Sequence, residues 1–111
     1  MVAGWDHDSA RLAAAAGKHA LVMCDSAESL LARADVQAVA ITAETSHRAE
    51  LVELAAAAGK AIILQKPMAL TLAEADRIVA VVELHRVPFT LAWQMRVDPH
   101  NLLARDHKYE P

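Results

Sequence analysis

The fold of this chain is decided by the stretch Ala61-Ile62-Ile63-Leu64-Gln65-Lys66-Pro67. Its first four residues are apolar, which is typical of a short buried β-strand. An amide, a lysine and a proline follow directly. Ligands of an open parallel sheet bind just beyond the carboxyl ends of its strands, so Lys66 is placed where its side chain can face a substrate.

Lys66 has two interpretations at this stage. Pro67 restricts its own φ and keeps the preceding residue out of the helical region, which gives Lys66 an extended backbone. A lysine held this way can take part in proton transfer. On the heptapeptide alone, a solvated lysine in a turn is the simpler interpretation, because most lysines lie on the surface.

Composition limits the class of protein. The chain has 111 residues, of which 55% are hydrophobic and 4% aromatic, which suits one small domain with helices packed on a sheet. A net charge of −3 argues against nucleic acid as a partner. Cys24 is the single cysteine, which excludes an internal disulfide and fits a reducing compartment. With no signal peptide or membrane span in the sequence, the expected location is the cytoplasm.

Strand and helix patterns alternate along the chain. Short helix-to-strand connections in this order predict an α/β fold, a Rossmann-like parallel sheet with flanking helices. Strands are expected at 1–5, 20–23, 36–42, 61–64 and 89–94, and helices at 9–16, 26–34 and 46–58. A fourth helix is expected from Leu72 to at least Val82, and a last helical turn begins at Pro99. The apolar run 36–42 predicts a strand covered on both faces.

Helix ends have their own signals. The hexapeptide Ala-Ala-Ala-Ala-Gly-Lys occurs at 13–18 and again at 55–60, which predicts the same helix-to-strand joint twice, with glycine ending each helix. Thr45 or Ser46 can cap the third helix, and residues 71–74 form a capping box for the fourth. Two apolar stripes are expected to face inward, Leu51, Leu54, Ala55 and Ala58 on the third helix and Leu72, Ala75, Ile78, Val79 and Val82 on the fourth.

Asp6 is the first candidate for cofactor binding. It ends the first strand, where dinucleotide-binding folds place an acid that accepts hydrogen bonds from a ribose. A helix N-cap is an equally good interpretation of the residue itself. The phosphate-binding sequence G-x-G-x-x-G is absent, because Gly4 is the only glycine before Gly17.

Two further segments end strands with polar groups. Residues 42–47, which include Thr42 and His47, offer hydroxyls and backbone donors suited to a phosphate, although ordinary capping explains the hydroxyls more simply. Arg96 follows the last strand and can contact a phosphate or carboxylate, or lie free on the surface. The six histidines show no metal-ligand spacing, so no metal site is predicted.

Taken together, these segments resemble the nucleotide-binding half of the Gfo/Idh/MocA oxidoreductases, the glucose–fructose oxidoreductase and inositol dehydrogenase family. The resemblance covers about 2–101. It rests on the acid and arginine at 6–11, the strand ending in threonine and then histidine at 39–47, and the Arg-x-Asp-Pro pattern at 96–99. The segment from Ala58-Gly59-Lys60 to Lys66-Pro67 is the most specific match. These correlated matches favour functional roles for Lys66 and Asp6.

The resemblance implies an NAD-dependent dehydrogenase, with NADP as a second possibility, that transfers hydride between the nicotinamide and a sugar, cyclitol or related polyol. Lys66 would be catalytic. The cofactor-binding residues would be Asp6, Thr42, His47, Gln65, Lys66 and Arg96. Asp6 would favour NAD, because a carboxylate repels a 2′-phosphate. A homo-oligomer is possible in the full-length protein.

Departures from the family pattern complicate this interpretation. Gln65 replaces the family's glutamate, Ala43 a common proline and Glu44 a common asparagine. The family's first strand with its phosphate loop is missing, as is its second domain. We therefore expect a fragment, with 1–99 as a partial dinucleotide-binding domain and 100–111 as the start of a linker, inactive when isolated. The alternative is a non-catalytic nucleotide-binding or interaction module, or a truncated remnant.

Overall fold

The computed structural model describes residues 1–107 and has the expected alternation of strands and helices. Residues 108–111, the end of the predicted linker, lie outside the described part. The strands are β1 (Ala3–Gly4), β2 (Val22–Met23), β3 (Ala38–Ile41), β4 (Ala61–Gln65) and β5 (Phe89–Ala92). The helices are α1 (Ser9–His19), α2 (Ala27–Leu31), α3 (Arg48–Ala57), α4 (Leu72–His85) and α5 (Pro99–His107), with 3₁₀ turns η1 (Thr45–His47) and η2 (Gln94–Arg96).

The strands form two separate parallel sheets, β1–β2 and β3–β4–β5. The predicted parallel α/β class is confirmed. In the order 3-2-1-4-5-6 of a doubly wound sheet, one strand lies between the two that correspond to β1 and β3. Within residues 1–107 no strand fills that position, and β1 and β3 do not pair with each other. The structure therefore keeps a gap where the sequence predicted a missing neighbour.

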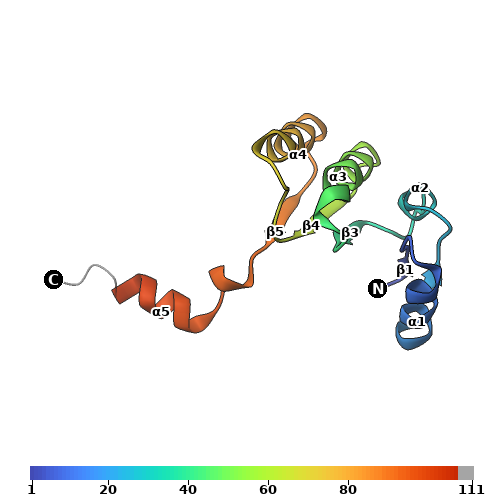
Figure 1. The fold of residues 1–111 in the computed structure, drawn as a ribbon, viewed down its shortest axis with the longest axis horizontal. Coiled ribbons are helices and arrows are strands. Elements are labelled where there is room, and N and C mark those ends of the chain that lie inside the picture. The colour runs from blue at the N-terminus through green and yellow to red at the C-terminus, as the bar shows by residue number, and fades with distance from the viewer. Residues whose placement is uncertain (108–111) are drawn as a thin grey trace.

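The hydrophobic core belongs to the three-stranded sheet. Its largest fully buried side chains are Ile62 and Leu64 of β4, Val52 of α3 and Ile78 of α4. Helices α2, α3 and α4 lie on one side of the strands, while α1 lies on the other (Figure 1). Helix α5 lies apart from both sheets and spans the predicted boundary between 99 and 100 (Figure 1).

The sheet is covered on one face only, which corrects two predictions. Ala38 and Ala40 of β3 are exposed, so this strand is not covered on both faces. On α4, Leu72 and Val79 are exposed rather than inward. Ala58, which directly follows α3, is exposed, whereas Val52 and Ala56, which the predicted stripe omitted, are fully buried. The buried faces of α3 and α4 also include their contact with each other, which a stripe read from one helix alone does not show.

The two predicted glycine joints differ. Gly59 has φ +70° and follows α3, as expected. Gly17 lies inside α1 instead, and Ala20 takes the left-handed conformation that ends this helix, with φ 52°. The capping box at the start of α4 is confirmed, since Thr71 Oγ1 accepts from the Glu74 N–H and a Glu74 carboxylate oxygen accepts from the Thr71 N–H, both at 3.2 Å.

Element boundaries also differ from the prediction. Strands β1, β2 and β3 are each shorter than expected. Neither Thr45 nor Ser46 caps α3 through its side chain, because both lie in the turn η1 that precedes it. Helix α2 ends at Leu31 rather than near 34. Strand β5 ends at Ala92, and η2 begins at Gln94.

Candidate functional site

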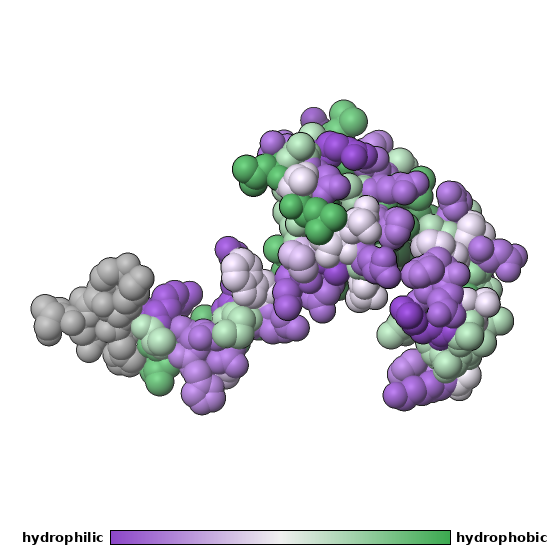
Figure 2. All heavy atoms as spheres, in the orientation of Figure 1, coloured by the Kyte–Doolittle hydropathy of each residue, from purple (hydrophilic) through white to green (hydrophobic). Residues whose placement is uncertain are grey.

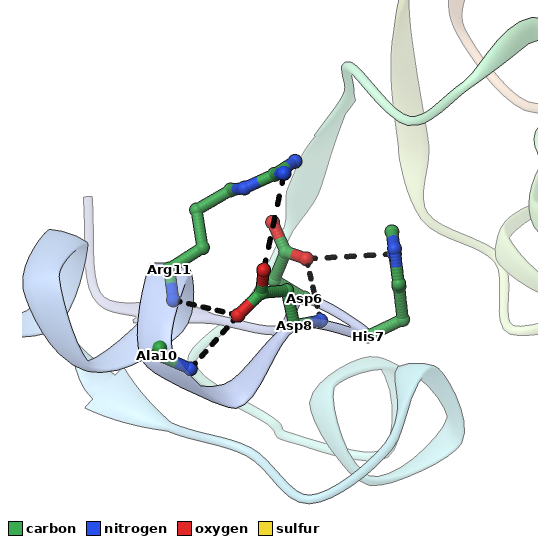
Figure 3. Close-up of polar contacts among 5 residues, drawn as sticks. All are labelled: Asp6, His7, Asp8, Ala10 and Arg11. Atoms are coloured by element: carbon green, nitrogen blue, oxygen red, sulfur yellow. Dashed lines mark hydrogen bonds and ion pairs between the residues drawn. The ribbon is translucent and has the colours of Figure 1, made fainter.

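Asp6 lies just after β1 and does not cap α1 (Figure 3). Its Oδ1 accepts a hydrogen bond from the Asp8 N–H at 2.8 Å and lies 3.5 Å from His7 Nδ1. Oδ2 accepts no hydrogen bond from residues 1–107. Asp6 therefore has one carboxylate oxygen available to a ligand.

Asp8 is the residue that caps α1. One of its oxygens accepts from the backbone N–H groups of Ala10 and Arg11, each at 3.0 Å (Figure 3). The hydrogen bond from the Arg11 N–H lowers the pKa of the Asp8 carboxyl, which keeps it ionised beside the positive end of the helix. Because Asp8 performs the capping, the N-cap interpretation of Asp6 is wrong.

A cavity of about 550 Å³ lies between the two sheets. We call it the inter-sheet cavity. Strands β1 and β3 form its two long sides, and apolar residues of α2 and α3, among them Leu31 and Leu51, also line it. Asp6 and Thr42, which follow β1 and β3, lie at one end. The carboxyl ends of two strands thus supply polar groups to one cavity, the arrangement expected for ligands of an open α/β sheet.

Lys66 lies at the carboxyl end of β4, as predicted, and its side chain is exposed. Its backbone N–H donates to Gln65 Oε1 at 3.1 Å, so the amide that replaces the family's glutamate is engaged locally. The Lys66 ammonium forms no hydrogen bond or ion pair within residues 1–107. It is free to meet a substrate oxygen.

Arg48 is a residue that the sequence interpretation missed. It is the first residue of α3 and only 6% exposed. Its Nε donates to the Ala43 carbonyl at 2.8 Å, and its Nη1 donates to the carbonyls of Gln65, at 2.7 Å, and Pro67. One guanidinium therefore joins the loop after β3 to both sides of Lys66.

A sequence signal for Arg48 did exist. It precedes Val52 and Ala55 by four and seven residues, so it belongs to the buried stripe of α3. A cation at such a position must have hydrogen-bond acceptors nearby, because burying an unpartnered charge is costly. The loop carbonyls supply them.

The remaining predicted residues are not gathered at the inter-sheet cavity. His47 is exposed on η1 and is not part of the lining. Arg96 lies on η2, with its Cζ 6.0 Å from the Trp93 ring centre, and lines a separate pocket with Asn101 and Arg105. Gln65 and Lys66 belong to the neighbouring strand end, and Arg48 links them to Ala43, which does line the cavity. Roles for all six residues stay predictions.

No group of three or more histidine, cysteine, aspartate or glutamate side chains among residues 1–107 could hold a metal ion. No helix in the same residues is long and apolar enough to cross a membrane.

Residues 1–92 match the Gfo/Idh/MocA family, described as an oxidoreductase family with an NAD-binding Rossmann fold. The chain belongs to this family. It is 44% identical over 72 residues to inositol 2-dehydrogenase of Gluconacetobacter diazotrophicus, which covers 65% of this chain and 21% of that protein. It is 45% identical over 102 residues to D-apiose dehydrogenase of Paraburkholderia graminis, which covers 89% of this chain and 27% of that protein.

A solved structure shows the same arrangement. The NAD-binding protein from Listeria innocua superposes with a TM-score of 0.84 and 26% identity, over 98% of this chain and 33% of that one. The chain thus spans about a quarter of the curated relatives it matches and a third of the solved neighbour. The Rossmann-like fold predicted from the sequence is confirmed, because the superposition spans both sheets.

Proposed function

We propose that this chain forms the cofactor-facing part of an NAD(P)-dependent dehydrogenase that moves hydride between the nicotinamide and a sugar, cyclitol or related polyol. One observation carries the proposal. Lys66 is exposed at the carboxyl end of β4, and the carbonyls on either side of it are held by a buried arginine. The family and the relatives, an inositol and an apiose dehydrogenase, support the reaction class.

The residues present fit the ribose end of a dinucleotide. Asp6 retains a carboxylate oxygen that can accept hydrogen bonds from ribose hydroxyls, and its charge disfavours the 2′-phosphate of NADP. Thr42, at the same end of the inter-sheet cavity, offers a hydroxyl. His47 and Arg96 would contribute from the two 3₁₀ turns. We infer a preference for NAD over NADP.

The proposed chemistry of this chain's own residues is proton transfer. Bound nicotinamide would accept or supply the hydride. The Lys66 ammonium would donate a hydrogen bond to the reacting oxygen of the polyol, and its amine form would accept the hydroxyl proton as the alcohol is oxidised. Gln65 leaves the neighbourhood of Lys66 without the carboxylate charge that the family pattern places there, which would make Lys66 the main proton carrier at this strand end.

The domain assignment remains part of the proposal. Residues 1–99 would be the nucleotide-binding part, and the linker would begin at 100, within α5. The activity and any homo-oligomer would belong to a longer protein, and the 111 residues alone would be inactive.

A chimera tests the function. Residues 1–92 would replace the matching segment of the Paraburkholderia graminis D-apiose dehydrogenase, and NADH formation from D-apiose would be measured beside cofactor binding. NAD-dependent turnover supports the proposal. A folded chimera that binds NAD without turnover would favour the non-catalytic module instead, and one that neither binds nor turns over would refute both.

A further inference from the structure

Arg48 is a buried cation at a position that is unfavourable for a cation. It is the first residue of α3 and only 6% exposed. The backbone dipoles of a helix give its N-terminus a partial positive charge, which repels a cation placed there. Arg48 forms no ion pair within residues 1–107 that would offset this repulsion. Helix α3 itself therefore gains nothing from the cation, and the task of Arg48 lies in the carbonyls that accept its hydrogen bonds.

Two of these carbonyls flank Lys66 along the chain. Arg48 Nη1 donates to the carbonyl of Gln65, at 2.7 Å, and to the carbonyl of Pro67. The Lys66 N–H donates to Gln65 Oε1 at 3.1 Å, so the backbone is also held at the lysine itself. Because the backbone conformation of a residue limits its side-chain rotamers, holding this backbone limits the positions that the Lys66 ammonium can reach.

The third carbonyl belongs to the neighbouring strand end. Arg48 Nε donates to the Ala43 carbonyl at 2.8 Å, and Ala43 lines the inter-sheet cavity after β3. Figure 2 shows the molecule hollowed between the part that carries α1 and the part that carries α3 and α4. The paired residues of β3 and β4 end at Ile41 and Leu64, so the strand ladder does not extend to the loops that follow. Arg48 joins the two loops where the strand pairing has ended.

A guanidinium suits this arrangement better than an ammonium does. It is planar and rigid, and its five N–H donors point in fixed directions. Three carbonyls that accept from one guanidinium are therefore held in place relative to one another. A lysine at the same position would keep the charge but would bring a single nitrogen on a flexible chain.

We propose that Arg48 is a positioning residue, which holds Lys66 in a fixed place relative to the polar end of the inter-sheet cavity. The inference rests on the proposed function, because it gives Arg48 this task only if Lys66 transfers a proton there. Arg48 acts through the backbone on either side of Lys66 and needs no contact with the substrate. Its loss would displace the lysine from the reacting oxygen, and a displacement of about 1 Å can lower a rate roughly 10²-fold.

A purely structural role for Arg48 makes a different prediction. If Arg48 only stabilised the loops, its variants would lower the fraction of folded protein and leave kcat per folded molecule unchanged. A positioning role lowers kcat in the folded protein. The KM and the dissociation constant of NAD then change little, because neither substrate nor cofactor loses a contact. The division of the effect between kcat and KM therefore separates the two roles.

The test uses the D-apiose dehydrogenase chimera, which contains both residues, with kcat expressed per molecule that binds NAD. The variants are Arg48→Ala, Arg48→Lys and the matched control Arg77→Ala. Arg77 is also a helical arginine, but among residues 1–107 it donates only to Glu53, on the surface. Guanidinium ion, far below unfolding concentrations, is added to Arg48→Ala to replace the missing group. Methylammonium ion is the matched additive, because it supplies a charge without the planar donors.

We expect kcat to fall roughly 10²-fold in Arg48→Ala, with little change in the KM for D-apiose or in the dissociation constant of NAD. Guanidinium should restore kcat toward the parent value, and methylammonium should not. Arg48→Lys should also lose kcat, because one ammonium cannot hold three carbonyls in place, and it serves as the test if Arg48→Ala does not fold. Arg77→Ala should keep the parent kcat.

Other results overturn the inference. A folded Arg48→Ala chimera with the parent kcat would show that Lys66 is positioned without Arg48, and the proposed function would stand. A loss confined to KM or to NAD binding would give Arg48 a binding role instead, and recovery with methylammonium would reduce its role to charge. Failure of both Arg48 variants to fold would assign the residue to stability alone. A parent chimera without turnover would refute the proposed function, and this inference with it.

Discussion

The hexapeptide Ala-Ala-Ala-Ala-Gly-Lys occurs in two helices and is buried in only one of them. In α3, Ala55 and Ala56 are 1% and 0% exposed, and Gly59 ends the helix. In α1, no residue is buried, and the equivalent glycine, Gly17, lies inside the helix. The difference is in the surroundings, because α3 packs on β4 and α4 whereas α1 packs only on the two short strands β1 and β2.

This contrast extends to the two sheets. The three-stranded sheet has a core of large apolar residues, while both residues of β2 are exposed. Helix α1 and strands β1 and β2 therefore contain no buried residue of their own. The site is divided in the same way, with Asp6 on the weakly packed side and Lys66 on the well-packed side.

The largest expected difference between the two regions is the loss of unfolding free energy when a side chain is shortened. Leu64→Ala leaves a cavity in the three-stranded sheet, where Leu64 is fully buried, and should lower the free energy of unfolding by about 2–5 kcal/mol. Val22→Ala on the exposed β2 should change it by under about 0.5 kcal/mol. Urea titration of both variants measures the difference, and similar losses would contradict the contrast.

Arg48→Met should have the next largest effect. It leaves three loop carbonyls without their donor, which should cost about 2 kcal/mol and speed hydrogen exchange at Lys66 and Met68. The matched control is Arg77→Met, since Arg77 pairs with Glu53 on the surface and should contribute less than about 1 kcal/mol. Equal effects on exchange near Lys66 would show that Arg48 does not hold that loop.

Asp6→Ser tests whether Asp6, in the weakly packed region, determines the preference for NAD over NADP. In the chimera with D-apiose dehydrogenase, it should reduce the preference for NAD over NADP roughly tenfold, because a charged hydrogen-bond acceptor is lost. Dissociation constants for both cofactors measure the ratio. Asp8→Ser, which keeps a capping side chain on α1, is the control and should leave the ratio unchanged. A parent chimera that prefers NADP would overturn the assignment.

The two glycines should respond with opposite signs. Gly59→Ala forces a side chain into a positive φ and should cost about 1 kcal/mol, whereas Gly17→Ala, within α1, should stabilise that helix by about 0.5–1 kcal/mol. Neither added Cβ meets an atom within 4 Å, so no clash confuses the comparison. Thermal unfolding of both variants is sufficient, and the same sign for both would mean that the hexapeptide behaves alike in its two contexts.

Local signals predicted the local features of the fold. The capping box at Thr71 and the strand expected at 61–64 depend on neighbouring residues, and both are confirmed, with the strand one residue longer than expected. The end of α1 could not be predicted, because Gly17 and Gly59 have the same preceding residues and only packing distinguishes them. The exposure of one face of β3 could not be predicted either. An apolar run has the same sequence whether or not a helix covers Ala38 and Ala40, and none of residues 1–107 forms a helix that does so.

The sequence predicted the positions of only those site residues that directly follow a strand. Asp6, Thr42 and Lys66 follow strands that the alternation located, so the sheet places them at the expected edge. Arg48 was missed because the predicted stripe of α3 omitted its position, and because its carbonyl partners carry no sequence signature of their own. Arg96 lies outside the inter-sheet cavity because it belongs to η2, which follows β5, and its role stays a prediction.

The most direct test of the account is the turnover of Lys66→Ala in the D-apiose dehydrogenase chimera. The account predicts that kcat falls by roughly 10²–10⁴-fold while the dissociation constant of NAD changes little, because the lysine moves a proton and does not anchor the cofactor. Lys60→Ala, which removes the lysine that donates to the Arg33 carbonyl, controls for a simple loss of a nearby lysine. Turnover near the parent value in Lys66→Ala would contradict the role of Lys66 and with it the proposed mechanism.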